Sequence, residues 1–144
     1  MIAVDTNILV YAHRPEPSLH AAALTLMRNL CEGTDAWGIP VHCLVEFAAV
    51  ASNRKIWRMP SAPTDIDRQL RAWTQSPSFF AIEESVLAVE QLTALMAKHS
   101  VHGGQVHDAR IIAACAAGGV STLYTVDRDF SRYQFPTENP LSHG

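Results

Sequence analysis

The sequence predicts an α/β fold in which helices cover both faces of a central, mainly parallel sheet. Short apolar runs typical of buried strands alternate along the 144 residues with longer segments whose apolar residues recur at helical spacing. No linker, repeat or low-complexity tract divides the chain, and its length is within the usual range of one domain. We therefore expect a single hydrophobic core.

Proline and glycine separate the elements predicted for the first half of the chain. Pro15 and Pro17 end the first apolar helix, because proline removes a backbone donor and clashes inside a helix. Gly33 stands just past a helical pattern, as expected at a helix C-terminus, and Pro40 separates the second strand from the next helix. The predicted elements are, in order, strand 2–4, helices 7–12 and 19–30, strand 35–39 and helix 41–55.

The second half begins with a loop that contains two prolines. Thr64 and Asp65 are favoured N-cap residues and predict the start of the next helix. Ser85 predicts the N-cap of a further helix, and Gly118 and Gly119 predict the end of the last one. The predicted elements are helix 65–75, strand 79–82, helix 86–99, helix 108–117 and strand 121–127, followed by a tail.

Composition limits the class of protein. Hydrophobic residues make up 48% of the chain, as in folded proteins, and no apolar run reaches the roughly 18 residues that a membrane span needs. Asp5 interrupts the first apolar run too early for a signal peptide, so we expect a cytoplasmic protein with no membrane partner. Cys31, Cys43 and Cys115 are far apart and form no CxxC pair, which argues against a disulfide framework or a zinc site.

Several carboxylates fall where the predicted strands end. Asp5 follows the first strand directly, and Asp127 ends the last strand, with Asp129 two residues further on. Asp108 begins a helix after a glycine-rich loop. Ligands bind outside the carboxyl ends of the strands in open α/β sheets, so these side chains are candidates for one site. Glu46 lies inside a predicted helix at the border of its apolar stripe, where an unpaired carboxylate is costly.

Each of these residues also has an ordinary explanation. Asp5, Thr6 and Asn7 are all favoured N-cap residues, and Asp108 suits a helix start, where the dipole favours an anion. The other acids could pair with an arginine or stabilise a turn. Carboxylates that converge at one edge of a sheet repel one another unless a cation lies among them. Oxygen ligands without cysteine suit Mg²⁺ or Mn²⁺, and the histidines near Asp108 are more commonly surface residues than ligands.

Three motifs, taken in order, resemble a known family. They are AVDTNILVY at the N-terminus, VEFAAV around Glu46 and HDARIIAACAAGGVSTLYTVDRDF near the C-terminus. Together they resemble the PIN-domain nucleases and, among them, VapC, the toxin ribonuclease of type II toxin–antitoxin pairs. The resemblance extends from residue 2 to about residue 136. It implies a three-layer α/β/α fold in one domain, residues 1–136, followed by a short tail, residues 137–144.

The resemblance also implies a catalytic and metal-binding site of four acids. Asp5, Glu46 and Asp108 match three of the family's acids, and the fourth lies in the segment TVDRDF. Asp127 and Asp129 both fit that fourth position. We expect Asp127 to be the main acid, with Asp129 in support beside it. Three further residues match positions that support the site or shape its pocket, namely Thr6, Asn7 and Thr125.

The implied activity is that of an endoribonuclease that depends on Mg²⁺ or Mn²⁺. Water would attack an RNA phosphodiester in line and leave a 5′-phosphate and a 3′-hydroxyl, and the cation would activate that water. The family usually forms homodimers. A cognate VapB antitoxin neutralises the toxin by laying its C-terminal segment over the active site, often with an inserted arginine.

A basic segment could hold the substrate despite the net charge of −3. Residues 54–73 contain five Lys or Arg residues against Asp65 and Asp67, a local charge of +3, with Trp57 and Trp73 among them. Basic residues follow phosphates and exposed aromatic rings stack on unpaired bases, although both tryptophans could equally belong to the core. The candidate contacts to RNA or antitoxin are Arg14, Arg54, Lys55, Arg58, Arg110 and Arg128.

Other functions stay open at this point. Another Mg²⁺-dependent phosphohydrolase, of the haloacid dehalogenase kind, needs a DxDxT motif, whereas Thr6 and Asn7 follow Asp5 here. A receiver domain needs a lysine near a later strand end, and TLYTVD contains none. A PIN module that binds RNA or protein without cutting it has usually lost acids, and all the acid positions are filled in this chain. A nuclease that acts on DNA is a further alternative.

Overall fold

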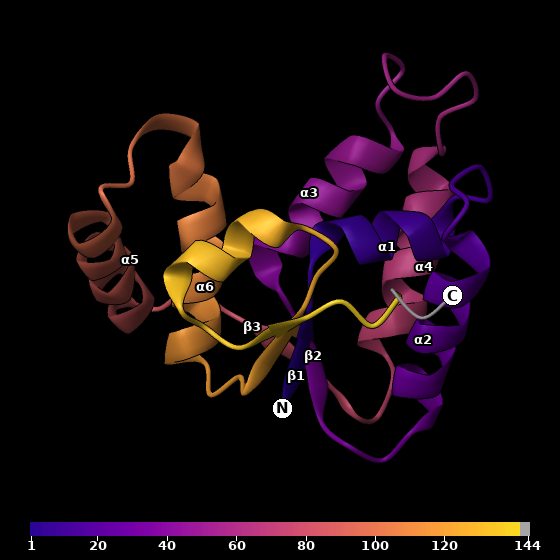
Figure 1. The fold of residues 1–144 in the computed structure, drawn as a ribbon. Coiled ribbons are helices and arrows are strands. Elements are labelled where there is room, and N and C mark those ends of the chain that lie inside the picture. Colours follow the sequence, from indigo (N-terminus) through magenta and orange to yellow (C-terminus); the bar gives the residue numbers. More distant parts are fainter. Residues whose placement is uncertain (142–144) are drawn as a thin grey trace.

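Five parallel strands form one sheet through the middle of the computed structural model, which describes residues 1–141 (Figure 1). The strand order is β3-β2-β1-β4-β5, so β1 is central. All four neighbouring pairs are parallel, so every strand ends at the same edge of the sheet. The strands are β1 (Ile2–Val4), β2 (Trp37–Pro40), β3 (Phe79–Ile82), β4 (Thr122–Tyr124) and β5 (Thr137–Glu138).

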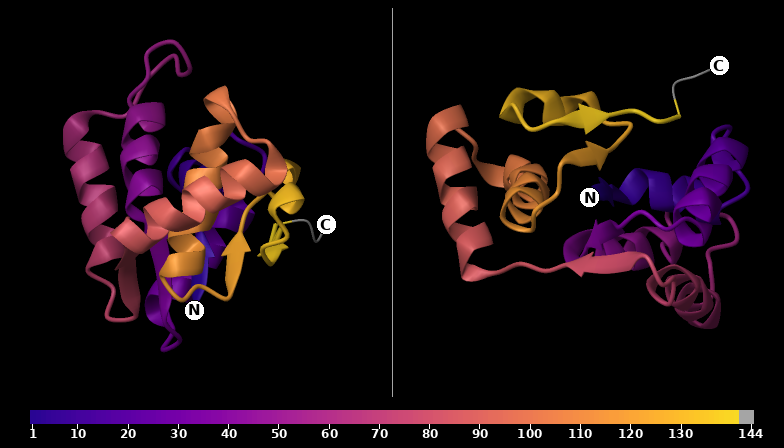
Figure 2. Two further views of the ribbon diagram at one scale, coloured as in Figure 1. Left: turned by 90° about the vertical axis from the view of Figure 1, so that its left-hand side faces the viewer. Right: turned by 90° about the horizontal axis from the view of Figure 1, so that it is seen from below.

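Helices cover both faces of this sheet. They are α1 (Thr6–His13), α2 (His20–Glu32), α3 (Val41–Ala51), α4 (Pro63–Thr74), α5 (Val86–His99), α6 (Val106–Ala117) and the short 3₁₀ helices η1 (Gly103–Gln105) and η2 (Arg128–Tyr133). α5 and α6 lie on one side of the sheet, and α1, α2 and α4 lie on the other (Figures 1 and 2). The predicted three-layer α/β/α fold is therefore confirmed. No helix in residues 1–141 is long and apolar enough to cross a membrane.

Local signals in the sequence account for several helix boundaries. The side chain of Asp5 caps α1 by accepting a hydrogen bond from the backbone N–H of Thr6 at 2.7 Å. Ser85 caps α5 as predicted and accepts a hydrogen bond from the N–H of Ala88 at 3.2 Å. Gly118 ends α6, also as predicted. These boundaries follow from contacts within a few residues, which is why the sequence reveals them.

The core lies between the central strands and the helices on both sides. Trp37 and Ile39 of β2 and Leu123 of β4 are fully buried. Phe47 of α3 is also fully buried, and Trp73 of α4 packs edge-on against it with ring centroids 5.0 Å apart. Burial of such a large apolar side chain contributes roughly 1.5–3 kcal/mol to stability. Trp73 is thus a core residue and not an exposed platform for stacking bases.

α3 ends at Ala51, whereas helical periodicity predicted a helix that reached residue 55. The side chain of Asn53 accepts a hydrogen bond from the backbone N–H of Lys55 at 2.8 Å. The carbonyl of Asn53 also accepts one from the N–H of Trp57 at 3.2 Å. The hydrogen bonds of Asn53 compete with those that would continue the helix. Residues 52–62 therefore form a connection, here termed the α3–α4 loop.

Two other helices begin earlier than predicted. α4 begins at Pro63, because the fixed φ of proline suits the first helical position, and the predicted caps Thr64 and Asp65 therefore lie inside the helix. α6 begins at Val106, directly after η1. This start places Asp108 in the first turn of α6, where the helix dipole favours a carboxylate.

Residues 137 and 138, which the sequence placed in a tail, form β5. They pair in parallel with Leu123 and Tyr124 of β4, and β4 ends at Tyr124, before the predicted end of that strand. The N–H of Thr125 continues the pairing with a hydrogen bond to the carbonyl of Glu138 at 2.9 Å. A strand of two residues has no periodicity to recognise in a sequence. Residues 142–144 of the predicted tail lie outside the described residues.

The close approach of β2 and β3 at Gly38 leads to a prediction about stability. A Cβ atom at this position would lie 2.4 Å from the backbone oxygen of Phe80, closer than real Cβ atoms approach. We expect Gly38→Ala to push the strands apart and to lower the free energy of unfolding by about 1–3 kcal/mol in urea denaturation. Gly104→Ala is the control, because nothing lies within 4 Å of a Cβ there. Equal stability of the two variants would contradict this packing.

Candidate active site

Asp5 is buried at the junction of β1 and α1, with only 4% of its surface exposed. Its Oδ1 atom accepts the capping hydrogen bond from Thr6, and its Oδ2 atom accepts a hydrogen bond from the hydroxyl of Thr125 at 2.8 Å. Asp5 is therefore a helix cap and also a buried carboxylate at the edge where parallel sheets bind ligands. The N-terminal motif can therefore serve both as a helix cap and as part of a metal site.

The buried position of Asp5 changes its acidity. Burial raises the pKa of Asp5 from 3.8 to about 6. The hydrogen bonds from Thr125 and Thr6 lower this pKa, whereas the negative charges of Glu46 and Asp127 raise it further. The ionised form of Asp5 is consequently costly unless a cation lies nearby.

Thr125 connects Asp5 to the residues that follow β4. Its hydroxyl donates to Asp5 and accepts a hydrogen bond from the N–H of Asp127 at 3.0 Å. The Oδ1 atom of Asp127 in turn accepts a hydrogen bond from the N–H of Asp129 at 2.8 Å and caps η2. One continuous chain of hydrogen bonds therefore orders acids from the two ends of the sequence.

Three carboxylates lie close enough to share one cation. Oxygen atoms of Asp108, Asp127 and Asp129 lie within 4.8 Å of one another, and these residues are here termed the aspartate trio. Asp108 comes from α6, and the other two come from the segment after β4. Burial raises the pKa of Asp108, and the charges of Asp127, Asp129 and Glu46 raise it further. Within residues 1–141, no histidine joins the trio.

Glu46 faces the same region from α3. Its side chain is 40% exposed, and its Oε2 atom lies 3.5 Å from Nε2 of His42, one helical turn earlier. The His42 ring stacks on the ring of His107, with centroids 6.0 Å apart. Burial lowers the pKa of His42, and the charge of Arg110 lowers it further. The spacing of four residues between His42 and Glu46 is the sequence signal for their contact, whereas only the structure reveals the stacking on His107.

The donor atoms fit a hard divalent cation. The aspartate trio offers carboxylate oxygens, which Mg²⁺ and Mn²⁺ prefer as ligands. The hydroxyl of Thr6 is buried next to Asp5 and has no hydrogen-bond partner among the described residues. A buried polar atom without a partner is costly, so this hydroxyl suits a hydrogen bond to a water or a ligand group beside Asp5.

The predicted basic contacts lie in different surroundings. Arg128 is exposed and lines a cavity of about 320 Å³ together with Asp108 and Asp129. Arg110 forms an ion pair with Glu84, with one N–O distance of 2.8 Å. The α3–α4 loop presents three exposed basic residues, Arg54, Lys55 and Arg58.

The two remaining candidates lie at opposite ends of α1. Asn7 is exposed in its first turn, whereas Arg14 follows its last residue and is 8% exposed. Arg132 and Tyr133, which the sequence did not indicate, line the same cavity as Arg128. They belong to η2, a short 3₁₀ helix without a hydrophobic period that a sequence could reveal.

The raised pKa of Asp5 predicts that stability falls with rising pH when cations are removed. Asp5 binds its proton more tightly in the folded chain than in the unfolded one, so its contribution is fully present below about pH 4 and is lost as the pH rises through 6. The loss is about 3 kcal/mol at most. Asp108, whose pKa is also raised, contributes a fall of the same sign in both proteins, so we expect urea unfolding in EDTA to show a larger loss for the wild type than for Asp5→Asn. Equal pH dependence of the two proteins would contradict the assignment.

Comparison with known proteins identifies the family. The family model for the PIN domain matches residues 2–136. Ribonuclease VapC43 of Mycobacterium tuberculosis is 30% identical over 137 residues, which cover 93% of this chain and 90% of the relative. The crystal structure of Mycobacterium tuberculosis VapC20, a Sarcin-Ricin loop cleaving toxin, has a TM-score of 0.68 at 19% identity and covers 94% of this chain and 96% of its own.

A second solved structure shares the fold. VapBC2 from Rickettsia felis, bound to a DNA fragment from its promoter, has a TM-score of 0.66 at 21% identity, and the match covers 96% of this chain and 98% of that one. At these identities the two structures show a common architecture. The family model spans residues 2–136, and VapC43 is similar over 90% of its own length, so the chain belongs to the PIN-domain family, among the VapC ribonucleases.

Proposed function

We propose that this VapC ribonuclease is a Mg²⁺-dependent endoribonuclease and the toxin of a type II toxin–antitoxin pair. The aspartate trio carries the proposal, because three carboxylates within 4.8 Å of one another favour a bound cation. The buried carboxylate of Asp5, linked to the trio through Thr125, supports it. Carboxylates around a divalent cation are suited to the hydrolysis of a phosphodiester.

Each acid has a role in this proposal. Asp108, Asp127 and Asp129 hold the cation, and Asp5 completes the site from the end of β1. When bound, the cation lowers the pKa of a water and offsets the negative charge that develops on the phosphate. Glu46 has a half-exposed carboxylate and accepts a proton at an Oε atom from the attacking water. The bond between phosphorus and the 3′-oxygen breaks as the water attacks, and the leaving 3′-oxygen takes a proton from solvent water. The products are a 5′-phosphate and a 3′-hydroxyl.

The supporting residues keep these acids in place. Thr125 donates to Asp5 and accepts from the backbone of Asp127, so one side chain orients both acids. Thr6 holds Asp5 through its backbone N–H, and its buried hydroxyl lies beside Asp5. The exposed Arg128 lies beside the trio, where it meets the phosphate of the RNA substrate or an acidic group of the antitoxin.

The proposed antitoxin is of the VapB type. Its C-terminal segment covers the acidic site and inserts an arginine among the carboxylates, since a guanidinium pairs well with carboxylates. The similarity to VapBC2 supports a partner of this kind.

We also propose that two copies of the chain form a homodimer. Val41 and Val45 of α3 are 37% and 64% exposed, and Val89 of α5 is 56% exposed. Two adjoining cavities that share Glu84 and Arg110 lie between them. Exposed apolar side chains beside a cavity favour contact with a partner, and we assign that partner to a second copy of the chain.

Substitution of the acids tests the proposed activity. On total cellular RNA with Mg²⁺, we expect discrete cleavage by the wild type and a loss of about 100-fold or more for Asp5→Asn and Asp108→Asn. EDTA should abolish cleavage. Comparison of Asp127→Asn with Asp129→Asn determines which of them is the more important acid. Asp67→Asn is the control, because Asp67 is an exposed acid of α4 that pairs with Arg71. Cleavage that persists in EDTA and in Asp5→Asn would exclude this mechanism.

The apolar surface on α3 and α5 predicts how the dimer can be disrupted. A charge at Val45 would have to be desolvated in the interface, so we expect Val45→Arg to raise the dimer dissociation constant by about tenfold or more. Light scattering after size exclusion measures the mass of each protein. Leu24→Arg on α2 is the control, because Leu24 is an exposed apolar residue outside this surface. A monomeric wild type, or equal masses for both variants, would rule out this interface.

A further inference from the structure

Arg14 is a buried arginine that contacts three residues of one loop. It is 8% exposed, at the C-terminal end of α1. Its Nη1 atom donates to the hydroxyl of Ser61 at 3.0 Å, and its Nη2 atom donates to the backbone oxygen of Met59 at 2.8 Å. Its guanidinium lies over the ring of Trp57, 4.6 Å from the centroid. All three partners belong to the α3–α4 loop.

The charge of Arg14 is already paired. Its Nε and Nη2 atoms both donate to the carboxylate of Glu16, and this pairing lowers the pKa of Glu16. An arginine that is buried, stacked and paired in this way has little capacity left to bind a phosphate. Arg14 is therefore poorly placed for the direct substrate contact that the sequence suggested.

Neighbouring side chains also attach the α3–α4 loop to the helices around it. His13 contacts the hydroxyl of Ser61 through Nε2 at 2.8 Å and Gln69 of α4 through Nδ1 at 3.0 Å. The indole N–H of Trp57 donates to the carbonyl of Val50 at 2.9 Å. The loop is thereby tied to α1 and α3, and His13 connects the same contacts to α4.

The loop that is held in this way is basic. It contains Arg54, Lys55 and Arg58, which are exposed, and no acidic residue between positions 52 and 62. Among the described residues, none of the three forms a salt bridge. The loop projects beyond the helices in two perpendicular views (Figures 1 and 2).

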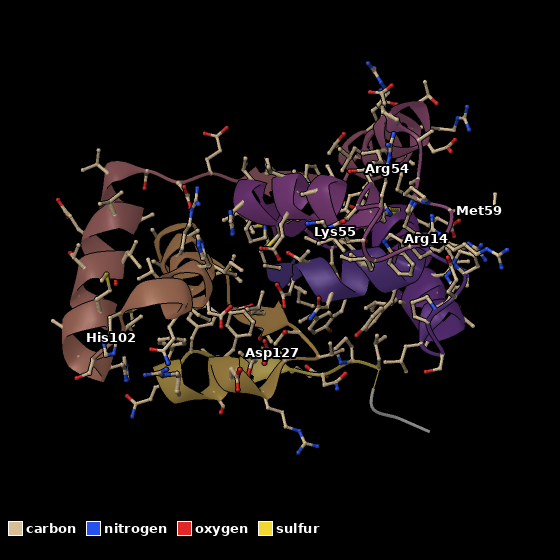
Figure 3. All side chains as sticks on the ribbon, turned by 90° about the horizontal axis from the view of Figure 1, so that it is seen from above. Arg14, Arg54, Lys55, Met59, His102 and Asp127 are labelled. Atoms are coloured by element: carbon tan, nitrogen blue, oxygen red, sulfur yellow. The ribbon has the colours of Figure 1, made fainter. Side chains whose placement is uncertain are left out.

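The basic loop lies to one side of the acidic site. Viewed from above, Asp127 lies near the centre of the molecule, whereas Arg54, Lys55, Arg14 and Met59 lie together on one side of it (Figure 3). An RNA strand whose phosphate reaches the acids can therefore extend toward positive charge. Charges held in position before binding cost less conformational entropy when the strand arrives.

We propose that Arg14 is a positioning residue that holds the α3–α4 loop as a basic arm for the phosphate backbone of the RNA substrate. This inference rests on the proposed function, because it assigns the arm to the same reaction. Arg54, Lys55 and Arg58 contact the RNA, and Arg14 acts through them. Ser61 is a neutral residue that accepts a hydrogen bond from Arg14, so its substitution should also weaken RNA binding.

The first experiment measures RNA binding and turnover. The probe is a fluorescein-labelled single-stranded RNA of 30 nucleotides and mixed sequence, followed by anisotropy in EDTA and by cleavage in Mg²⁺. We expect Arg14→Gln to weaken binding and raise KM by about tenfold with kcat within twofold, and Ser61→Ala to have the same effect at about threefold. Arg14→Lys should not restore affinity, because lysine has the charge but not the planar fork.

Two further variants test the arm and the specificity of the effect. Arg54→Gln should lower the slope of log affinity against log salt by about 0.7, the value for one lost phosphate contact to a single strand. Arg28→Gln on α2 is the matched control, because Arg28 is exposed and belongs to another helix. We expect it to leave both KM and the salt slope unchanged.

The second experiment uses trypsin, which cuts after lysine and arginine. Cleavage after Arg54, Lys55 and Arg58 should be slow in the wild type and faster in Arg14→Gln and Ser61→Ala, with other sites unchanged. Faster cleavage throughout the chain would indicate general loss of stability and would overturn a positioning role. If Arg14→Gln does not fold, Ser61→Ala and Trp57→Phe decide the question. Ser61→Ala removes the hydroxyl that contacts Arg14 and His13, and Trp57→Phe removes the hydrogen bond to Val50, while Arg14 itself stays in place.

The outcomes distinguish a failure of this inference from a failure of the proposed function. A wild type that cleaves RNA while the loop variants leave KM unchanged overturns the inference alone. A second outcome also overturns the inference. If Arg14→Gln loses affinity for RNA while Ser61→Ala does not, and trypsin still cuts the loop slowly, then Arg14 binds RNA directly. A wild type that neither binds nor cleaves RNA overturns the proposed function too.

Discussion

Repulsion among carboxylates at one edge of a parallel sheet is the constraint on which the rest of the site depends. Parallel strands end together, so the acid after β1 and the acids after β4 cannot avoid one another. Burial is the largest cause of the raised pKa values of Asp5 and Asp108, and the charges of their acidic neighbours raise both values further. Such an arrangement is stable only with compensation, which protons supply at low pH and a divalent cation supplies near neutrality.

Hydrogen bonds from the surrounding structure keep these carboxylates close to one another. Thr125 orders Asp5 and Asp127 with one hydroxyl, and Asp127 orders the start of η2. Asp5 also caps α1, so the helix that leaves the site depends on the same carboxylate. A substitution of Asp5 therefore changes the charge of the site, a helix cap and a link between β1 and β4 together. For this reason stability and activity have to be measured on the same variants.

The separation of charge over the molecule explains how a chain of net charge −3 can bind RNA. The negative charge is concentrated where a cation is expected, whereas the α3–α4 loop carries only basic charged side chains. Pairing with Glu16 neutralises the charge of Arg14, and the hydrogen bonds from Arg14 to Ser61 and Met59 attach the loop that carries the other basic residues. In this view Arg14 contributes through the geometry of the loop, and the exposed basic residues contribute through electrostatics.

The fold class, most of the helices and strands, and the acids near the strand ends can be predicted from the sequence alone. These features depend on periodicity and on caps such as Ser85, which act over a few residues. Three features depend on long-range packing: Asp129 lies with Asp108 and Asp127, Thr125 binds Asp5 across 120 positions, and β5 completes the sheet.

The same holds for Arg14, whose buried contact with Ser61 spans 47 positions. Contacts between such distant residues depend on how helices and strands pack, and no local pattern encodes that packing.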